Sequence, residues 1–355
     1  MSGMTTDTPY FEMSRDKLQK NLDILLYIER RAGAKILHTV KSFNQPEALR
    51  IITQSISGAS IGNLNELPSS ISDIYIHSYA PYFHKRDIAD IAKASNSMSL
   101  NSLYQWDLYS EEIGRDTSLG LRINPKLTIK QPRYCNPNRS AWLGVDEELF
   151  LSDMAHSPER YEGLKGLHFH VLCSQELGGL KYLLAHIDKN FSAIMPHIEW
   201  INLGGGHNFT GERYDIDGLI ALLNNFTKKH QDIQLIFEPG ESVVKESGVF
   251  VTTVVDIIDN SIAILDTSIE AHMLDIAITK ISPEVVGASK DSGEYRYQLT
   301  GMSCIAGDII GDYYFDKPLK IGDRVIFADM MGYSMVKQTE FNGIEKAEFR
   351  LVRAF

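Results

Sequence analysis

Lys41 occupies the position in this chain that is best suited to covalent chemistry. An apolar stretch, Ile36 to Thr39, reads as a strand that ends just before this lysine, and Pro46 then opens a helical segment. A lysine at the carboxyl end of a strand can form an imine with a carbonyl compound. Most lysines are solvated surface charges, so Lys41 alone would prove little. Its importance depends on what lies at the ends of the other strands.

Three further features follow apolar segments later in the chain. His170 stands in GLHFHV, the triplet Gly204 to Gly206 in INLGGG, and Glu238 in LIFEPGE. The glycines form either a simple tight turn or a loop whose bare amides approach a phosphate. Because Glu238 follows apolar strand residues, we expect it at the mouth of a site and not on a solvated face.

The two histidines of GLHFHV are expected to have different environments. Alternation along a strand would send His168 and His170 to opposite faces, so they should not chelate a metal together, and no metal is expected. We expect one to be a core histidine with its hydrogen bonds satisfied, and the other to lie flat against an aromatic cofactor. An imine lysine, a stacking histidine, phosphate-binding amides and an acid for a pyridine nitrogen together predict a pyridoxal phosphate site.

Strands and helices alternate through the first two thirds of the chain. A helix from about Ser14 carries leucines on one face and ends before Gly33. Eight strands are predicted, near 36–39, 59–62, 74–77, 98–100, 119–123, 167–171, 198–203 and 235–237. They favour an α/β fold with a closed (βα)8 TIM-like barrel over residues 14–245, and an open doubly wound sheet is the alternative. Catalytic groups of such barrels lie at the carboxyl ends of the strands.

The pattern changes beyond residue 245. The segments GVFVTTVVDII, SIAILDTS, YRYQLTG and RVIFADM look like strands without amphipathic helices between them. We therefore predict a C-terminal β domain made of residues 246–355 together with residues 1–13.

Composition excludes several classes of partner. Lys plus Arg number 35 and Asp plus Glu number 46, and the formal charge of -11 disfavours nucleic acid and anionic membranes. No apolar run is long enough to span a bilayer, and no basic stretch precedes an apolar one at the start, so we expect a cytoplasmic protein. Cys135, Cys173 and Cys304 are few and far apart, which fits neither a disulfide framework nor a zinc knuckle.

The order and spacing of these residues resemble the barrel-type (fold III) pyridoxal-phosphate decarboxylases, a group related to alanine racemase. By this resemblance, Lys41 is the imine lysine, His170 stacks on the ring, Gly204, Gly205 and Gly206 hold the phosphate, and Glu238 binds the pyridine nitrogen. GMSCIAGD resembles the motif whose cysteine, here Cys304, reaches into the partner subunit's site. The resemblance therefore implies a homodimer with shared active sites, in which Tyr333 contacts the cofactor phosphate.

Departures from the diaminopimelate decarboxylase pattern point to the substrate. EPGE places Glu241 after Gly240 where those enzymes carry an anion-binding arginine, and Ile305 replaces a glutamate after the motif cysteine. An acid at that place should attract an amine and repel a carboxylate. In HVLCSQ, Cys173 or Ser174 must replace a phosphate-contacting serine. These sequences resemble the carboxynorspermidine and carboxyspermidine decarboxylases of bacterial polyamine synthesis, in which Asp275 matches a substrate-contacting acid.

The resemblance implies decarboxylation of carboxynorspermidine, carboxyspermidine or both. The expected catalytic residues are Lys41, Cys304 and His170. The cofactor is expected to contact Lys41, His170, Cys173, Ser174, Gly204, Gly205, Gly206, Glu238, Gly240 and Tyr333. The substrate is expected to contact Glu238, Glu241, Asp275 and Asp308. The residue that reprotonates the product carbon, Cys304 or Lys41, stays open. Alternatives are another amino-acid decarboxylase (diaminopimelate, ornithine or arginine type), a racemase, a noncatalytic pyridoxal-phosphate carrier and, weaker, a nicotinamide enzyme using GGGHNFTG.

Overall fold

The computed structural model describes residues 7–68, 71–113, 117–127, 129, 142–230 and 233–355. The chain forms two compact units. One unit comprises residues 21–243, and the other combines the residues up to Lys20 with Val244–Phe355. Among the described residues, no helix is both long and apolar enough to cross a bilayer.

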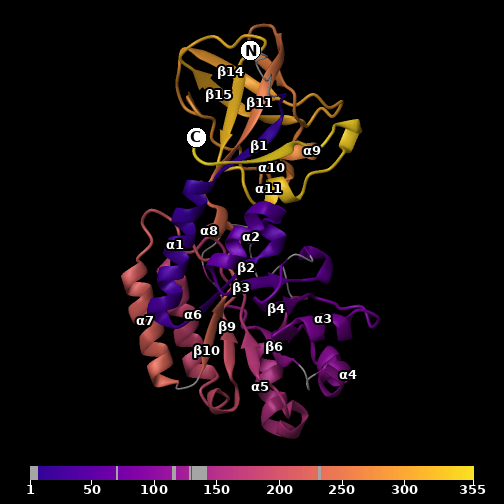
Figure 1. Cartoon of the computed structure of the whole chain (residues 1–355), viewed down its shortest axis with the longest axis vertical. Helices are drawn as coiled ribbons and strands as arrows, with labels where there is room; N and C mark the ends of the chain where they lie inside the picture. Colours follow the sequence, from indigo (N-terminus) through magenta and orange to yellow (C-terminus); the bar gives the residue numbers. More distant parts are fainter. Residues whose placement is uncertain (1–6, 69–70, 114–116, 128, 130–141, 231–232) are drawn as a thin grey trace. The chain divides into compact units, whose positions relative to one another are not determined.

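The unit of residues 21–243 is a closed parallel barrel (Figure 1). Its eight strands pair in a ring, because β10 pairs with β2 and β5 pairs with β6. In ring order they are β2 (Lys35–Thr39), β3 (Gly58–Ile61), β4 (Tyr75–Tyr79), β5 (Ser97–Leu100), β6 (Ser118–Asn124), β8 (Gly166–His168), β9 (Trp200–Asn202) and β10 (Gln234–Phe237). The two-residue strand β7 (Val145–Asp146) pairs with β6 outside this ring. The predicted barrel is confirmed, and the open sheet is excluded.

Helices form the outer layer of the barrel (Figure 1). They are α1 (Arg15–Ala32), α2 (Pro46–Ser55), α3 (Ile88–Ala94), α4 (Leu103–Ile113), α5 (Glu147–His156), α6 (Leu177–Asn190), α7 (Ile216–Lys229) and α8 (Glu241–Val244). The apolar stripe predicted for α1 is real: Leu18, Leu22 and Leu25 are fully buried. This helix ends before Gly33, whose φ of 63° is the left-handed conformation that glycine adopts most easily. Single turns η1 (Val40–Ser42), η2 (Leu64–Glu66), η5 (Pro158–Tyr161) and η6 (Met195–His197) complete the connections.

The barrel strands bury both polar and apolar side chains. Trp200 packs where a Cβ on Gly166 would lie 2.1 Å from its ring, so this glycine makes room for the indole. Beside Trp200, at a ring distance of 5.3 Å, lies His77, which is fully buried. Ser97, Ser99, His168 and Asn202 are also fully buried. Burying polar groups of this kind costs free energy unless they are hydrogen-bonded or bind a ligand. This part of the barrel is therefore a candidate binding site.

The second unit is built around one sheet. Its strands follow the order β13 (Ala288–Ser289), β15 (Ile309–Phe315), β14 (Tyr295–Thr300), β12 (Ile262–Leu265), β11 (Gly248–Ile258), β1 (Tyr10–Ser14) and β17 (Glu348–Val352), and β16 (Arg324–Ala328) also pairs with β11. Short helices α9 (Ile269–His272), α10 (Leu274–Thr279) and α11 (Tyr333–Val336) and the turn η7 (Phe341–Gly343) lie between strands. The four strand segments predicted here are confirmed as β11, β12, β14 and β16.

Candidate active site

Lys41 lies in the turn η1, immediately after β2, and its side chain is exposed. The strand ends at Thr39, so Lys41 is two residues beyond the tip and is carried by a single 3-10 turn. Its positive charge acts on His168 and His170, where it is one of the causes that lower the pKa. Lys41 is therefore electrostatically coupled to the two histidines that follow β8.

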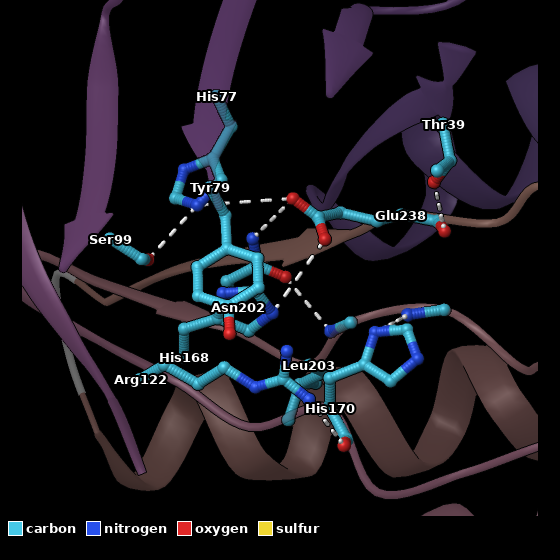
Figure 2. A network of polar contacts seen from close by, with 12 residues as sticks. Thr39, His77, Tyr79, Ser99, Arg122, His168, His170, Asn202, Leu203 and Glu238 are labelled. Atoms are coloured by element: carbon cyan, nitrogen blue, oxygen red, sulfur yellow. Dashed lines mark hydrogen bonds and ion pairs between the residues drawn. The ribbon is translucent and has the colours of Figure 1, made fainter. Parts of the chain in front are cut away.

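Glu238 is held by the elements around it at the end of β10, as Figure 2 shows. Its carboxylate is buried and accepts a hydrogen bond of 2.8 Å from Nδ2 of Asn202, the last residue of β9. The main-chain carbonyl of Glu238 accepts a hydrogen bond of 2.7 Å from the hydroxyl of Thr39. Side chain and backbone of this acid are thus fixed by two neighbouring strands.

Two buried imidazoles flank the Glu238 carboxylate (Figure 2). Nε2 of His77 lies 3.8 Å from Oε1, and Nε2 of His168 lies 3.6 Å from Oε2. Burial lowers the pKa of His77, while Glu238 opposes that shift. For His168, burial and then the charge of Arg122 lower the pKa well below its ordinary value. Both imidazoles are therefore neutral at pH 7, and among the described residues no lysine or arginine forms an ion pair with Glu238.

The expectation of a core histidine with satisfied hydrogen bonds is wrong. His168 is fully buried, yet neither of its ring nitrogens has a hydrogen-bond partner among the described residues. The other histidine, His170, is half-buried. Because β8 ends at His168, the alternation of a strand does not extend to His170.

The expectation that these histidines could not share a metal is also wrong. Ligand atoms of His168, His170 and Glu238 lie within 4.8 Å of one another, close enough for one ion. The neutral imidazoles and the carboxylate are chemically suited to a transition metal. The same atoms lie beside Lys41 and the glycine triplet, and those features fit a phosphorylated aromatic cofactor better than a lone ion.

The glycine triplet follows β9 and is tightly enclosed. Gly204 and Gly206 have φ values of 67° and 81°, and a Cβ on Gly205 would lie 2.5 Å from the carbonyl oxygen of Glu238. The amide of Gly204 donates 2.8 Å to Oδ1 of Asn202, and the amide of Gly205 donates 3.3 Å to Nδ1 of His170. Two of the three amides thus already have side-chain acceptors. The longer bond, from Gly205, ends on His170, the histidine that is expected to lie against the cofactor ring.

Pyridoxal phosphate fits this set of residues. Glu238 is a buried carboxylate whose flanking imidazoles are neutral, so a protonated pyridine nitrogen would give it a cationic partner. His168 offers buried nitrogens without hydrogen bonds, and the triplet offers close backbone approach where side chains would not fit. The residues that would hold the cofactor are Lys41, His170, Glu238 and the glycines 204–206.

The loop after His170 differs from our expectation in one respect. Cys173 takes part in a disulfide bond, so the inference that the cysteines form no disulfide is wrong, and this residue has no free thiol to offer a phosphate. The spacing of the cysteines in the sequence gave no sign of this bond. Ser174, with a φ of 48°, directs its hydroxyl to Oε2 of Glu241 at 3.3 Å. Gly240 is needed for packing, because a Cβ there would lie 2.6 Å from the hydroxyl of Ser42.

In the β unit, Asp308 is held by hydrogen bonds to two neighbouring residues. Its buried carboxylate accepts hydrogen bonds from the amides of Ile269 (2.8 Å) and Ser303 (3.1 Å) and from the Ser303 hydroxyl (2.6 Å). These three bonds involve both carboxylate oxygens, and the predicted contact of Asp308 with substrate stays a prediction. Asp308 anchors the loop that carries Cys304, whose thiol is free and exposed.

Asp275 and Tyr333 are linked through one lysine. Nζ of Lys337 lies 2.6 Å from Oδ1 of Asp275 and 4.7 Å from the centre of the Tyr333 ring. The predicted substrate acid is therefore already paired with a cation in this unit. An incoming ammonium group would have to compete with Lys337.

Sequence reasoning missed several residues of the barrel site. Arg122, on β6, is buried, lies 4.7 Å over the Tyr79 ring and donates 3.3 Å to the carbonyl of His170. Asn202 and His77 both lie beside Oε1 of Glu238, at 2.8 and 3.8 Å. The signal available for them was their place at the ends of predicted strands, where the barrel gathers its functional groups.

The chain belongs to the pyridoxal-dependent decarboxylases. The family model described as "Pyridoxal-dependent decarboxylase, C-terminal sheet domain" matches residues 38–331. Within this family, the chain is 36% identical to the carboxynorspermidine/carboxyspermidine decarboxylase of Campylobacter jejuni, over 98% of this chain and 96% of that protein. It is also 36% identical to the carboxyaminopropylagmatine decarboxylase of Synechocystis, over 98% of this chain and 93% of that protein.

Solved structures agree with this relationship. The carboxynorspermidine decarboxylase of Campylobacter jejuni, solved in complex with norspermidine, has a TM-score of 0.88 and 36% identity, covering 97% of this chain and 94% of that one. Diaminopimelate decarboxylase from Helicobacter pylori, with a TM-score of 0.80 and 18% identity over 98% of this chain and 92% of that one, shares the fold. The resemblance found in the sequence is confirmed.

Proposed function

We propose that this chain uses pyridoxal phosphate to decarboxylate carboxylated polyamines, releasing carbon dioxide and a polyamine. The observation that carries this proposal is the buried Glu238 carboxylate, fixed by Asn202 and Thr39 between neutral imidazoles. A carboxylate in that environment favours a cationic pyridine nitrogen over a neutral one.

The roles of the residues follow from this assignment. Pyridoxal phosphate supplies the electron sink that makes loss of carbon dioxide possible. Lys41 binds the cofactor carbonyl carbon, His170 lies against the ring, and Glu238 keeps a proton on the pyridine nitrogen. The glycine triplet holds the phosphate. Cys304 or Lys41 returns a proton to the carbon that loses the carboxylate.

The cofactor assignment is tested by borohydride reduction. Reduction of the reconstituted protein should fix the pyridoxyl group to Lys41, as peptide mass spectrometry would show. Lys35, whose ammonium lies 5.1 Å from the Tyr75 ring, is the control position and should carry no label. Label on another lysine, or no visible absorbance after reconstitution, would exclude the assignment.

The names of the relatives define the substrate class but not the substrate. Two proteins equally similar to this chain act, by name, on substrates whose tails differ, one ending in an amine and the other in a guanidinium. We propose carboxynorspermidine or carboxyspermidine, because GMSCIAGD and EPGE resemble that group. Comparing kcat/KM for these two compounds and for carboxyaminopropylagmatine decides among the three. The amine-tailed compounds differ by one methylene, so we expect their values to lie within about 200-fold.

Glu241 is proposed to contact an ammonium group of the substrate. It is exposed at the start of α8, three residues after Glu238, and lies 3.3 Å from the Ser174 hydroxyl. Glu241→Gln should raise KM for a carboxylated triamine about tenfold and leave the affinity for pyridoxal phosphate unchanged. The control is Glu199→Gln, which removes an exposed acid that pairs with Lys165 before β9 and should change neither. An unchanged KM for Glu241→Gln would show that Glu241 does not contact the ammonium group of the substrate.

We also propose a cytoplasmic homodimer in which each site takes Lys41 from one chain and Cys304 from the other. The support is the resemblance of GMSCIAGD to a motif that crosses between subunits, together with the exposed Cys304 thiol. Mixing inactive Lys41→Ala and Cys304→Ala chains should restore about a quarter of the activity, since about half of the dimers are mixed and each has one intact site. Mixtures that exchange subunits but stay inactive would place both residues in one chain's site.

A further inference from the structure

Asn202 connects the two ends of the proposed cofactor site. It is fully buried at the end of β9, and its side chain makes two hydrogen bonds of 2.8 Å. Nδ2 donates to Oε1 of Glu238, and Oδ1 accepts from the amide of Gly204, the first residue of the glycine triplet. A single carboxamide therefore links the Glu238 carboxylate to the glycine triplet (Figure 2).

The chemistry of the partners allows only one orientation of this carboxamide. A main-chain amide can only donate, so it must meet the oxygen of Asn202, and an ionised carboxylate can only accept, so it must meet the nitrogen. Aspartate, nearly the same in shape, could satisfy Gly204 but not an ionised Glu238. Asparagine is thus the residue that serves both partners at once.

The main chain reinforces the same connection. The amide of Glu238 donates 2.8 Å to the carbonyl of Gly204, and a Cβ on Gly205 would collide with the carbonyl of Glu238. Acid and loop are therefore already adjacent, and Asn202 adds a hydrogen bond that fixes the acidic side chain relative to the loop. Neither flanking histidine makes a hydrogen bond with Glu238 that could replace it, because they lie 3.8 and 3.6 Å away.

We propose that Asn202 is a positioning residue that fixes the Glu238 carboxylate relative to the glycine triplet, and so sets the distance between the sites for the pyridine nitrogen and the phosphate. The proposal rests on the proposed function. It assigns to Asn202 a role through Glu238 and not a contact with the substrate.

Asn202→Asp tests this role because it keeps the acceptor for Gly204 and removes the donor to Glu238. Two carboxylates at hydrogen-bond distance must share a proton, which takes negative charge from Glu238. Titration of the apoprotein should show an affinity for pyridoxal phosphate lowered about 10- to 100-fold, with inorganic phosphate binding within about threefold of wild type. In the holoenzyme, kcat should fall while KM for substrate stays near the wild-type value. The control is Asn96→Asp, an exposed asparagine whose Oδ1 accepts from the amide of Ile76, and it should change none of these quantities.

A swapped pair separates positioning from charge. Glu238→Gln alone keeps the bond to Asn202 and loses the charge. Combined with Asn202→Asp, the new amide can donate to the new carboxylate, so the bond is restored with reversed direction. The double variant should regain the apoprotein melting temperature and the cofactor affinity of Glu238→Gln, although its kcat stays low.

The outcomes distinguish this proposal from the proposed function. If wild type binds pyridoxal phosphate but Asn202→Asp behaves as wild type, or the double variant is no better than Asn202→Asp, the positioning role is wrong. If wild type itself binds no pyridoxal phosphate, the proposed function fails, and the melting temperatures of the apoproteins still decide whether Asn202 and Glu238 are coupled.

Discussion

The hydroxyl of Thr39 donates a hydrogen bond of 2.7 Å to the main-chain carbonyl of Glu238, and the amide of Thr39 donates to the carbonyl of Pro239. These bonds join the ends of β2 and β10, whose pairing closes the barrel. Lys41 lies two residues after Thr39, so the proposed imine lysine and the proposed pyridine-binding acid follow two strand ends that are hydrogen-bonded to each other. Any change at Thr39 should therefore affect stability and cofactor binding together.

Thr39→Val removes the hydroxyl and keeps the shape of the side chain. The buried carbonyl of Glu238 then loses its described side-chain donor, and the free energy of unfolding should fall by about 1–3 kcal/mol. Urea denaturation of the apoprotein measures this change. Thr53→Val is the matched control, because that hydroxyl donates within α2 to the carbonyl of Leu49, and its loss should cost less. Equal effects of the two substitutions would contradict the role given to Thr39.

Glu238→Gln should separate stability from activity. A buried carboxylate beside neutral imidazoles is costly in the apoprotein, so its replacement by an amide of the same shape should leave the apoprotein as stable or up to about 1 kcal/mol more stable. Decarboxylation should nevertheless fall about 100-fold, because the pyridine nitrogen loses its anionic partner. Urea unfolding and carbon dioxide release measure the two effects. A large loss of stability with retained activity would show that Glu238 is structural.

His207 should make the protein less stable in acid. Burial lowers the pKa of His207 from 6.5 to about 4 in the folded chain, with a hydrogen bond to the carbonyl of Leu203 opposing the shift. Between pH 6.5 and 4 the unfolded chain therefore binds more protons than the folded one, and stability falls as the pH falls. The loss reaches about 3 kcal/mol near pH 4 and is absent above pH 6.5.

The measurement for His207 is the slope of the unfolding free energy against pH. His207→Gln should reduce this slope by about 1.4 kcal/mol per pH unit between pH 6.5 and 4. The comparison uses slopes, so any general destabilisation by the substitution cancels. An unchanged slope would mean that His207 binds its proton equally well in the folded and unfolded chains, so that burial does not lower its pKa. Burial also lowers the pKa of His38 to about 4. His38 is unchanged in the His207→Gln variant, so its own contribution to the slope, of about the same size, should remain.

The barrel could be predicted because parallel strands buried on both faces appear in the sequence as short apolar runs. Both β3 and β5 are buried along their whole length, and each of the eight predicted segments overlaps one barrel strand. Residues 1–13 were assigned to the β domain, but β1 was not predicted as a strand. In the structure it pairs with β11 and β17, which lie more than 230 residues away in the chain.

Within the site, residue types could be predicted but not their partners. The strand before His170 was expected to continue to Val171, and because it ends at His168 the predicted faces of the two histidines did not apply. The place of Asn202 at a strand end could be predicted, but its two bonds could not, since they depend on where β9 and β10 end relative to each other. Partners of this kind are fixed by tertiary contacts and not by local sequence.

Asp308 provides a test that separates a structural acid from a substrate-binding one. Its carboxylate accepts from the buried amide of Ile269 and from the amide and hydroxyl of Ser303. Asp308→Ala leaves these donors without an acceptor, so the free energy of unfolding should fall by about 2–5 kcal/mol. Amide hydrogen exchange at residues 269 and 303 should accelerate as the loop that carries Cys304 loosens.

Asp312→Ala is the control for Asp308, because Asp312 is an exposed acid of the same unit that pairs with Arg296, and its loss should cost no more than about 1 kcal/mol. A substrate-binding Asp308 would behave in the opposite way. Its replacement by Asn would then raise KM for a carboxylated polyamine and leave stability and exchange unchanged. We expect Asp308→Asn to be intermediate in stability, since the amide keeps one acceptor for the main-chain donors, and to lower activity through a displaced Cys304.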